Sequence, residues 1–302
     1  MFPLLILLTS CDGCRPQLPS STDPPPEQDT DRPDDSAEET GDSGPPPRCE
    51  TEEIEPNDLP DSQQTIPMEA WACGSFDRAY DIDWFQFTTV ESGWVEVSVE
   101  AAARGTSANP QFLLTGPDDS ALALDAYLTT DPRVVFPSAA VGDYQITLND
   151  TYLAGNEQYG WWMIASITKA PVVWDVSEVE PNDAMTTAEE LAVNQTVFGY
   201  VGRAGDYDWY HIVTADEAAT ITFTVEAFAK GSLADLTLQL YEPDGTVIRV
   251  DRQGEIDYDR DPWFEQRVVG ATEWYLQVQT ADDRGSSFHW YTLNITSTPS
   301  GA

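Results

Sequence analysis

The chain has 302 residues, with 14 Lys and Arg against 53 Asp and Glu, and a formal net charge of −39. This charge excludes binding to a nucleic-acid backbone, because phosphate contacts require clustered Lys and Arg. Only two His residues occur, His211 and His289. Histidine-based catalysis and zinc ligation therefore have almost no side chains to draw on.

The N-terminus starts with a short apolar run, Phe2 to Leu8. A membrane-spanning helix needs roughly 20 apolar residues, so we interpret residues 1–10 as a signal peptide. Leu8-Thr9-Ser10-Cys11 resembles the bacterial lipobox, which predicts lipidation of Cys11. The alternative is an ordinary signal peptide with an incidental cysteine. A lipidated chain would be held on a membrane in the cell envelope, at the outer membrane or cell surface of a Gram-negative bacterium.

Residues 11–48 are rich in proline and acidic residues and have very few apolar side chains. Such a segment cannot bury enough apolar surface to offset the entropy of ordering. Proline favours extended polyproline II and like charges repel each other. We therefore predict a disordered, semi-stiff tether between the anchor and the folded part.

The folded part contains an internal repeat. Glu53-Ile54-Glu55-Pro56-Asn57-Asp58 recurs as Glu178-Val179-Glu180-Pro181-Asn182-Asp183, at an offset of 180 − 55 = 125. Asp81-Ile82-Asp83-Trp84-Phe85 recurs at the same offset as Asp206-Tyr207-Asp208-Trp209-Tyr210. A repeat of this length has the size of a small domain and is too long for a solenoid unit. We therefore predict two copies of one domain, over residues 49–170 and 171–302.

Both copies have the pattern of β-strands. Residues 94–99 and 220–225 alternate apolar and polar side chains, which indicates strands with one buried face. Further strands are expected at 111–114, 144–148 and 162–167, matched in the second copy by 236–240, 275–279 and 291–295. Short helices are expected only near 62–64 and 187–191. The predicted fold class is all-β, with two tandem antiparallel β-sandwiches of jelly-roll type.

The Glu-x-Glu-Pro-Asn-Asp motif, followed about 25 residues later by Asp-x-Asp-Trp-Phe/Tyr, resembles the bacterial pre-peptidase C-terminal domain. That family consists of β-sandwich modules and is similar to the collagen-binding modules of clostridial collagenases. The resemblance covers about 49–170 and 174–298. It implies a module that accompanies secreted enzymes, although no catalytic domain is recognised in this chain.

The repeated acidic motif is a candidate calcium site. Calcium prefers six to eight oxygen ligands, and alternate residues of an extended segment point the same way. The resemblance implies that the first acidic segment and the Asp before the strand aromatics ligate one structural calcium ion per copy. The alternative is a metal-free turn whose carboxylates cap backbone amides. The predicted ligands are Glu53, Glu55, Asn57, Asp58, Asp81 and Asp83 in the first copy and Glu178, Glu180, Asn182, Asp183, Asp206 and Asp208 in the second.

Cys49 and Cys73 are the predicted disulfide. Cys14 is the third remaining cysteine, so three pairings are possible in an exported chain. At offset 125, Cys49 and Cys73 correspond to the aromatic residues Trp174 and Phe198, which suggests spatial neighbours in both copies. The alternative is that all three thiols remain reduced.

The motifs favour a non-catalytic role. The sequence has no Ser-His-Asp set, His-Glu-x-x-His or glycine-rich phosphate loop. We expect a cell-surface lipoprotein that displays two calcium-stabilised sandwiches for adhesion or for interaction with an extracellular protein. The alternative is polysaccharide binding through exposed tryptophans, with one of Trp161 and Trp162 facing outward because the two are adjacent in a strand.

Overall fold

The computed structural model describes residues 48–117, 121–123, 130–138, 141–251 and 260–300, all of which belong to one compact unit. The predicted signal peptide, the predicted lipidation site at Cys11, Cys14 and nearly all of the predicted tether lie outside the described residues. Within the described part, no helix is long and apolar enough to cross a bilayer.

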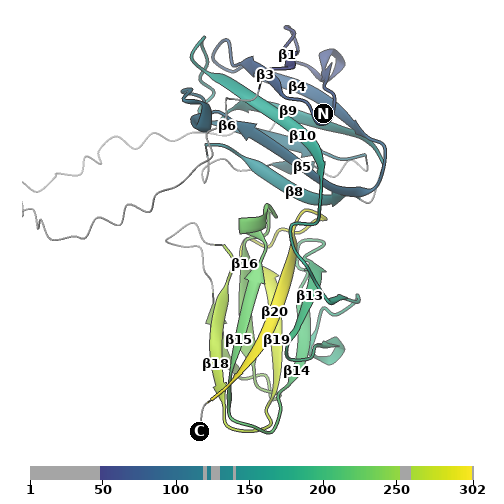
Figure 1. The fold of residues 1–302 in the computed structure, drawn as a ribbon, viewed down its shortest axis with the longest axis vertical. Helices are drawn as coiled ribbons and strands as arrows, with labels where there is room; N and C mark the ends of the chain where they lie inside the picture. The colour runs from purple at the N-terminus through teal and green to yellow at the C-terminus, as the bar shows by residue number, and fades with distance from the viewer. Residues whose placement is uncertain (1–47, 118–120, 124–129, 139–140, 252–259, 301–302) are drawn as a thin grey trace, which may run out of the picture. The chain divides into compact units, whose positions relative to one another are not determined.

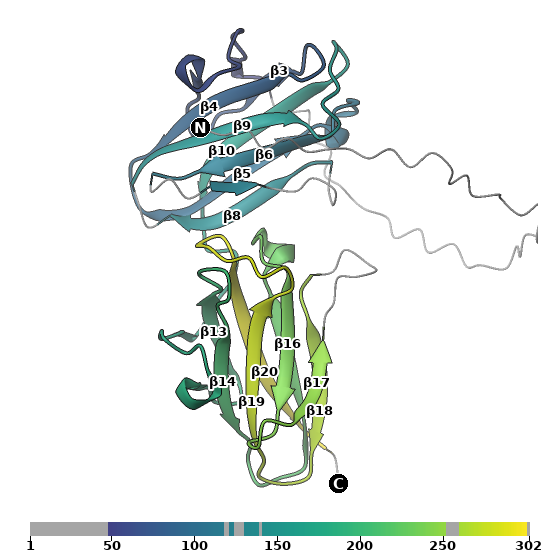
Figure 2. The same cartoon turned by 180° about the vertical axis from the view of Figure 1, so that it is seen from behind.

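The first copy consists of two five-stranded sheets, in the orders β1-β3-β10-β5-β8 and β2-β4-β9-β6-β7. Figure 1 shows these layers from one side and Figure 2 from the other. The elements are β1 (Thr51–Glu52), η1 (Pro60–Ser62), β2 (Gln64–Thr65), β3 (Ala72–Ser75), β4 (Ile82–Thr89), β5 (Gly93–Glu100), η2 (Ala102–Arg104), β6 (Pro110–Thr115), β7 (Ala121–Ala123), β8 (Arg133–Ser138), β9 (Gly142–Asp150) and β10 (Gly160–Thr168).

The second copy repeats this arrangement, with sheet orders β11-β13-β20-β15-β18 and β12-β14-β19-β16-β17. Its elements are β11 (Val176–Ser177), η4 (Met185–Thr187), β12 (Glu189–Glu190), β13 (Gln195–Tyr200), β14 (Asp208–Val213), β15 (Ala219–Glu226), η5 (Phe228–Lys230), β16 (Leu236–Tyr241), β17 (Val247–Asp251), β18 (Trp263–Val268), β19 (Glu273–Thr280) and β20 (Trp290–Pro299). The predicted class, two β-sandwiches, is confirmed.

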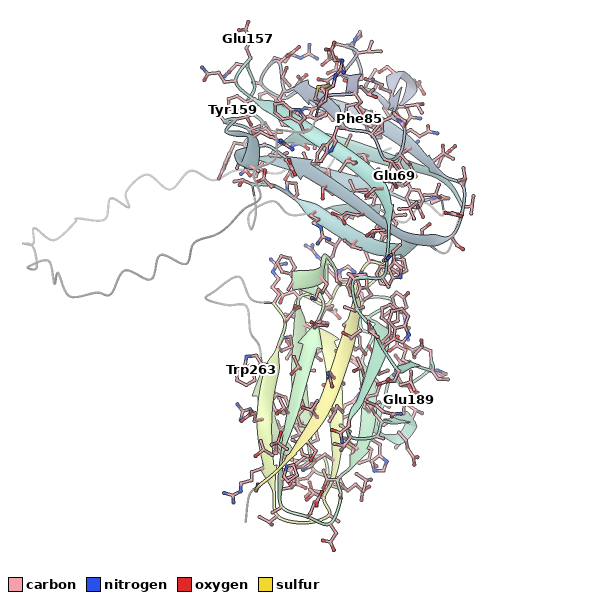
Figure 3. All side chains as sticks on the ribbon, in the orientation of Figure 1. Glu69, Phe85, Glu157, Tyr159, Glu189 and Trp263 are labelled. Atoms are coloured by element: carbon pink, nitrogen blue, oxygen red, sulfur yellow. A yellow bond between two sulfur atoms is a disulfide. The ribbon has the colours of Figure 1, made fainter. Side chains whose placement is uncertain are left out.

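Alternating side chains build each core. In β5 the valines at 95, 97 and 99 are at most 1% exposed, while the residues between them are half-buried. β4 contributes Phe85, labelled in Figure 3, and Phe87 in the same way, since both are 0% exposed. The corresponding strands β14 and β15 bury Tyr210 and Phe223 in the second copy. The period of two therefore identified the buried faces correctly.

The sheets are not purely antiparallel, contrary to the expectation. The two-residue strands β1, β2, β11 and β12 pair in parallel with β3, β4, β13 and β14. The expected short helices are single 3-10 turns that begin two residues early, at Pro60 and Met185, and the residues after them enter strands. The reason is that the chain on either side of the acidic segment adds a short strand to the edge of each sheet, one before the segment and one after the 3-10 turn.

The pairing of the last strand in each copy also corrects the sequence alignment of the two copies. Trp161 pairs with Gly74 in β3, and Tyr291 pairs with Gly199 in β13. Because Gly74 and Gly199 are 125 residues apart, Trp161 corresponds to Tyr291. The sequence-based match, in which 162–167 stands in for 291–295, is wrong by one residue. Since successive side chains face opposite sides of a strand, this error exchanges core and surface positions.

Tryptophans are mostly covered. Trp161 and Trp290 are 0% exposed, whereas Trp263, the first residue of the edge strand β18, is 48% exposed (Figure 3). The indole N–H of Trp290 donates to the carbonyl oxygen of Val135 at 2.7 Å, and its ring meets that of Trp94 edge-on at 5.0 Å. These rings serve packing within the compact unit.

Candidate metal centres

Each acidic segment is fixed to the sheets by its backbone. The N–H of Glu53 donates to the carbonyl of Cys73 at 2.9 Å and prolongs the short parallel ladder between β1 and β3. The carbonyl of Asn57 then accepts from the N–H of Trp84 in β4 at 3.0 Å. The segment thus crosses from one sheet to the other, and its side chains meet those at the start of β4. Glu178 and Asn182 make the equivalent bonds in the second copy.

Three carboxylates of each copy converge. One oxygen from each of Glu53, Glu55 and Asp83 lies within 4.8 Å of the other two. Asn57 organises the first centre, because its Nδ2 donates to Oε1 of Glu53 at 3.1 Å and its backbone N–H donates to Glu55 at 3.0 Å. The second copy brings together the corresponding residues, which are Glu178, Glu180 and Asp208.

Asp83 is the buried aspartate of the first centre, and its surroundings disfavour its charged form. It is 0% exposed, and among the described residues no donor group reaches either of its carboxylate oxygens. Burial, followed by repulsion from Glu53, raises the pKa of Asp83 far above its ordinary range. Burial likewise raises the pKa of Glu53. Buried carboxylates at this separation must either share a proton or bind a cation.

A glycine makes room for the innermost glutamate in each copy. A Cβ at Gly74 would collide with the Glu53 carboxylate and with the Trp161 ring. A Cβ at Gly199 would collide with Glu178 and with the Tyr291 phenol. These glycines are therefore part of the centres, because only a residue without a side chain allows so close an approach.

The predicted sets of six residues divide into two groups. Asp58 and Asp81 stand beside the converging carboxylates but pair with Arg78, at 2.6 Å and 3.5 Å respectively. Asp81 also accepts the backbone N–H of Asp77 at 2.6 Å. Asp183 and Asp206 pair in the same way with Arg203, at 3.2 Å and 3.8 Å. These four aspartates are thus partly neutralised beside each centre.

The second centre contains two phenols that the first lacks. The Tyr291 hydroxyl donates to Oδ2 of Asp208 at 2.6 Å, and the Tyr210 hydroxyl lies 2.7 Å from that of Tyr291. Tyr210 also reaches Oε2 of Glu178 at 3.3 Å. Burial, then repulsion from Glu178, raises the pKa of Asp208, while the bond from Tyr291 opposes the rise. Phe85 and Trp161 occupy the corresponding positions in the first copy.

The donor set fits a hard divalent cation. Each centre offers three carboxylates and a buried asparagine whose Oδ1, within the described part of the chain, receives no hydrogen bond. No His or Cys belongs to either group found among the described residues. An all-oxygen set that can reach six or seven ligand atoms with bidentate carboxylates suits calcium better than magnesium.

Comparisons with protein families and with curated proteins gave no match. Among solved structures, the chain is similar to the pre-peptidase C-terminal domain of a collagenase from Bacillus anthracis, at 16% identity over 36% of this chain and 94% of that chain, with a TM-score of 0.30. It is also similar to the CBM22-1–CBM22-2 tandem of Xyn10C from Paenibacillus barcinonensis, at 8% identity over 71% and 82% of the two chains, with a TM-score of 0.21.

Sequence reasoning missed the arginines, glycines and phenols of the centres. Arg78 and Arg203, like Gly74 and Gly199, recur at the offset of 125, so the repeat contained the signal for all four. Tyr291 was missed for a different reason. Its offset from Trp161 is 130, because the residues between β5 and β10 differ in number from those between β15 and β20.

Proposed function

We propose that this chain is a non-catalytic binding module in which each sandwich is stabilised by one calcium ion. Glu53, Glu55, Asn57 and Asp83 would hold the first ion, and the second would be held by Glu178, Glu180, Asn182 and Asp208. The cation would neutralise the buried carboxylates and join the acidic segment to both sheets. The module would then present stable surfaces for adhesion or for binding an extracellular protein.

This proposal rests on the burial of Asp83 and Asp208 and on the hydrogen bonds that their carboxylates lack. Both side chains are 0% exposed, and both keep at least one carboxylate oxygen without a hydrogen bond from the described residues. A turn-and-cap role would instead give these carboxylates a backbone N–H donor and a basic partner, as Asp81 and Asp206 have. An uncompensated buried carboxylate is costly, so its occurrence at the same place in both copies favours a bound cation.

The test is thermal unfolding of the full chain in millimolar calcium and in chelator. A ligand at 100 times its Kd adds about 2.7 kcal/mol for each site that binds only the folded state. We expect a higher melting temperature in calcium, reduced in Asp83→Ala and in Asp208→Ala and absent in the double variant. Identical melting curves with and without calcium would refute the proposal.

We also propose a cellular location for this module. Lipidation at Cys11 and an acidic tether would hold the two sandwiches at the surface of a Gram-negative outer membrane. Radiolabelled palmitate incorporation that is lost in Cys11→Ala would support the anchor. Equal release of wild type and Cys11→Ala into the medium would contradict it.

Polysaccharide binding is a second candidate function, favoured by one surface feature. The half-buried rings of Trp71 and Trp162 flank the Arg104 guanidinium, at 5.5 Å and 5.9 Å from its central carbon. This outer-face group could stack on a sugar. Trp162→Ala should then abolish retention on a glycan column while leaving the melting temperature unchanged. Trp161 is unsuitable for this test because it is part of the core.

A further inference from the structure

The two centres share their carboxylates and the backbone N–H groups that bond the glutamates, but they differ in the side chains that hold them. In the first centre, the Asn57 amide supports Glu53, and neither oxygen of Asp83 receives a hydrogen bond from the described residues. In the second centre, the phenols of Tyr210 and Tyr291 take over this support. Both side-chain polar atoms of the buried Asn182 are then left without a partner among the described residues.

The phenols of Tyr210 and Tyr291 form a hydrogen-bonded chain that ends on the carboxylate of Asp208. Tyr210 can donate to Tyr291 or to Glu178, and Tyr291 donates to Oδ2 of Asp208. Asp208 is thereby fixed through one oxygen, while its Oδ1 remains without a donor among the described groups. Groups that hydrogen-bond a ligating carboxylate fix its orientation, and their removal typically costs about 10–100-fold in metal affinity.

The first copy cannot make this chain. Phe85 stands at the position of Tyr210 and Trp161 at that of Tyr291. Phe85 has no donor, and the indole N–H of Trp161 is buried without an acceptor among the described residues. The rings meet edge-on at 5.3 Å, so they fill the space but do not hold the carboxylates.

We propose that Tyr210 and Tyr291 are positioning residues that make the second centre bind divalent cations more tightly than the first. This inference rests on the proposed calcium sites and adds an order of filling. At rising calcium concentration the second sandwich becomes loaded first, and the first sandwich responds only at higher concentration.

The test is calorimetric titration of the chelator-treated full chain with calcium. Wild type should show two classes of site, of which Asp208→Asn removes the tighter and Asp83→Asn the weaker. Tyr291→Phe should weaken the tighter class about tenfold or more and leave the weaker class unchanged. Tyr241→Phe is the matched control, because its phenol bonds Gln239 and Gln277 in the same copy and should not alter either class.

The outcomes separate the two proposals. No calcium heat in wild type would refute the calcium sites themselves. Two sites of equal affinity, a tighter first centre, or an unchanged affinity in Tyr291→Phe would overturn only the role of the phenols. If Tyr291→Phe fails to fold, Tyr210→Phe tests the same chain one step further out and should still weaken the tighter class alone.

Discussion

Trp174 stacks on Phe198 at a ring-centroid distance of 4.6 Å, at the two positions where the first copy has the Cys49–Cys73 disulfide. The predicted cysteine pairing is thus present, and an aromatic contact replaces it in the second copy. Both pairs join the residues before the acidic segment to the strand beneath them. The acidic segment is therefore held at its start in two chemically different ways.

Loss of the disulfide should destabilise the first copy selectively. Closing a loop of this length contributes about 3 kcal/mol in the loop-entropy estimate. We expect Cys49→Ser with Cys73→Ser to lower the free energy of unfolding by roughly that amount and to speed amide exchange in β1 and β3. Exchange in β11 and β13 should stay at the wild-type rate. Equal acceleration in both copies would contradict the local role.

Asparagine at position 83 should have opposite effects with and without calcium. In chelator, Asp83→Asn avoids the cost of burying or protonating a carboxylate beside Glu53 and supplies a donor, so we expect stabilisation of about 1–3 kcal/mol. In calcium the same change removes a ligand, so the melting temperature should fall below that of wild type. The exposed Asp61→Asn is the control and should have little effect in either condition. The measurement is paired thermal melts.

The stability of the calcium-free protein should fall as pH rises. Burial, then the neighbouring glutamate, raises the folded-state pKa of Asp83 to about 10 and that of Asp208 to about 9. In the unfolded chain an aspartate titrates at about 3.9. Between these values the folded state binds more protons, so the free energy of unfolding decreases with pH.

Calorimetry in chelator should therefore give a lower melting temperature at about pH 8.5 than at about pH 5.5. Calcium should cancel this trend, because binding requires ionised carboxylates and releases protons. The calcium-induced rise in melting temperature should accordingly be larger at the higher pH. A calcium-free melting temperature that climbs throughout this range would show that the carboxylates are not the controlling groups.

Alanine at Gly74 should damage both the fold and the first centre. The added methyl group would collide with the Glu53 carboxylate and the Trp161 ring, and overpacking of this kind typically costs about 1–3 kcal/mol. We expect a lower melting temperature and a smaller gain from calcium. Gly93→Ala is the control, because its Cβ would meet only Ile167, at an ordinary 3.8 Å. Equal effects of the two substitutions would rule out a specific role for Gly74.

Much of the fold could be predicted because alternation and repetition are local. Residues 94–99 and 220–225 alternate, and their strands extend by one residue at each end in β5 and β15. The two-residue strands were not predictable, since Thr51–Glu52 has no period to detect. Their pairing depends on the sheet edge that the rest of the copy creates.

The centres were predictable only in part. The fixed offset identified the carboxylates, but it could not show which ones face inward. The structure separates Asp83 from Asp81 because Asp83 lies within β4 while Asp81 precedes the strand, and because Arg78 pairs with Asp81 and Asp58. The role of Tyr291 depends on the register of β20 against β13, which insertions hide from a comparison at constant offset.

The short parallel strand β1 also determines how the first copy would carry mechanical load. A pull on the chain at Arg48 reaches Cys49 at once, and the disulfide passes the force to Cys73 in β3. Strand β3 is hydrogen-bonded along β10 over four residue pairs, so the load is distributed across that ladder. The two residue pairs of β1 are thereby relieved of tension. In the second copy the same pull would meet no covalent link at this position, but the stacked rings of Trp174 and Phe198, which can slide apart, and the hydrogen bonds between Asp175 and Thr196.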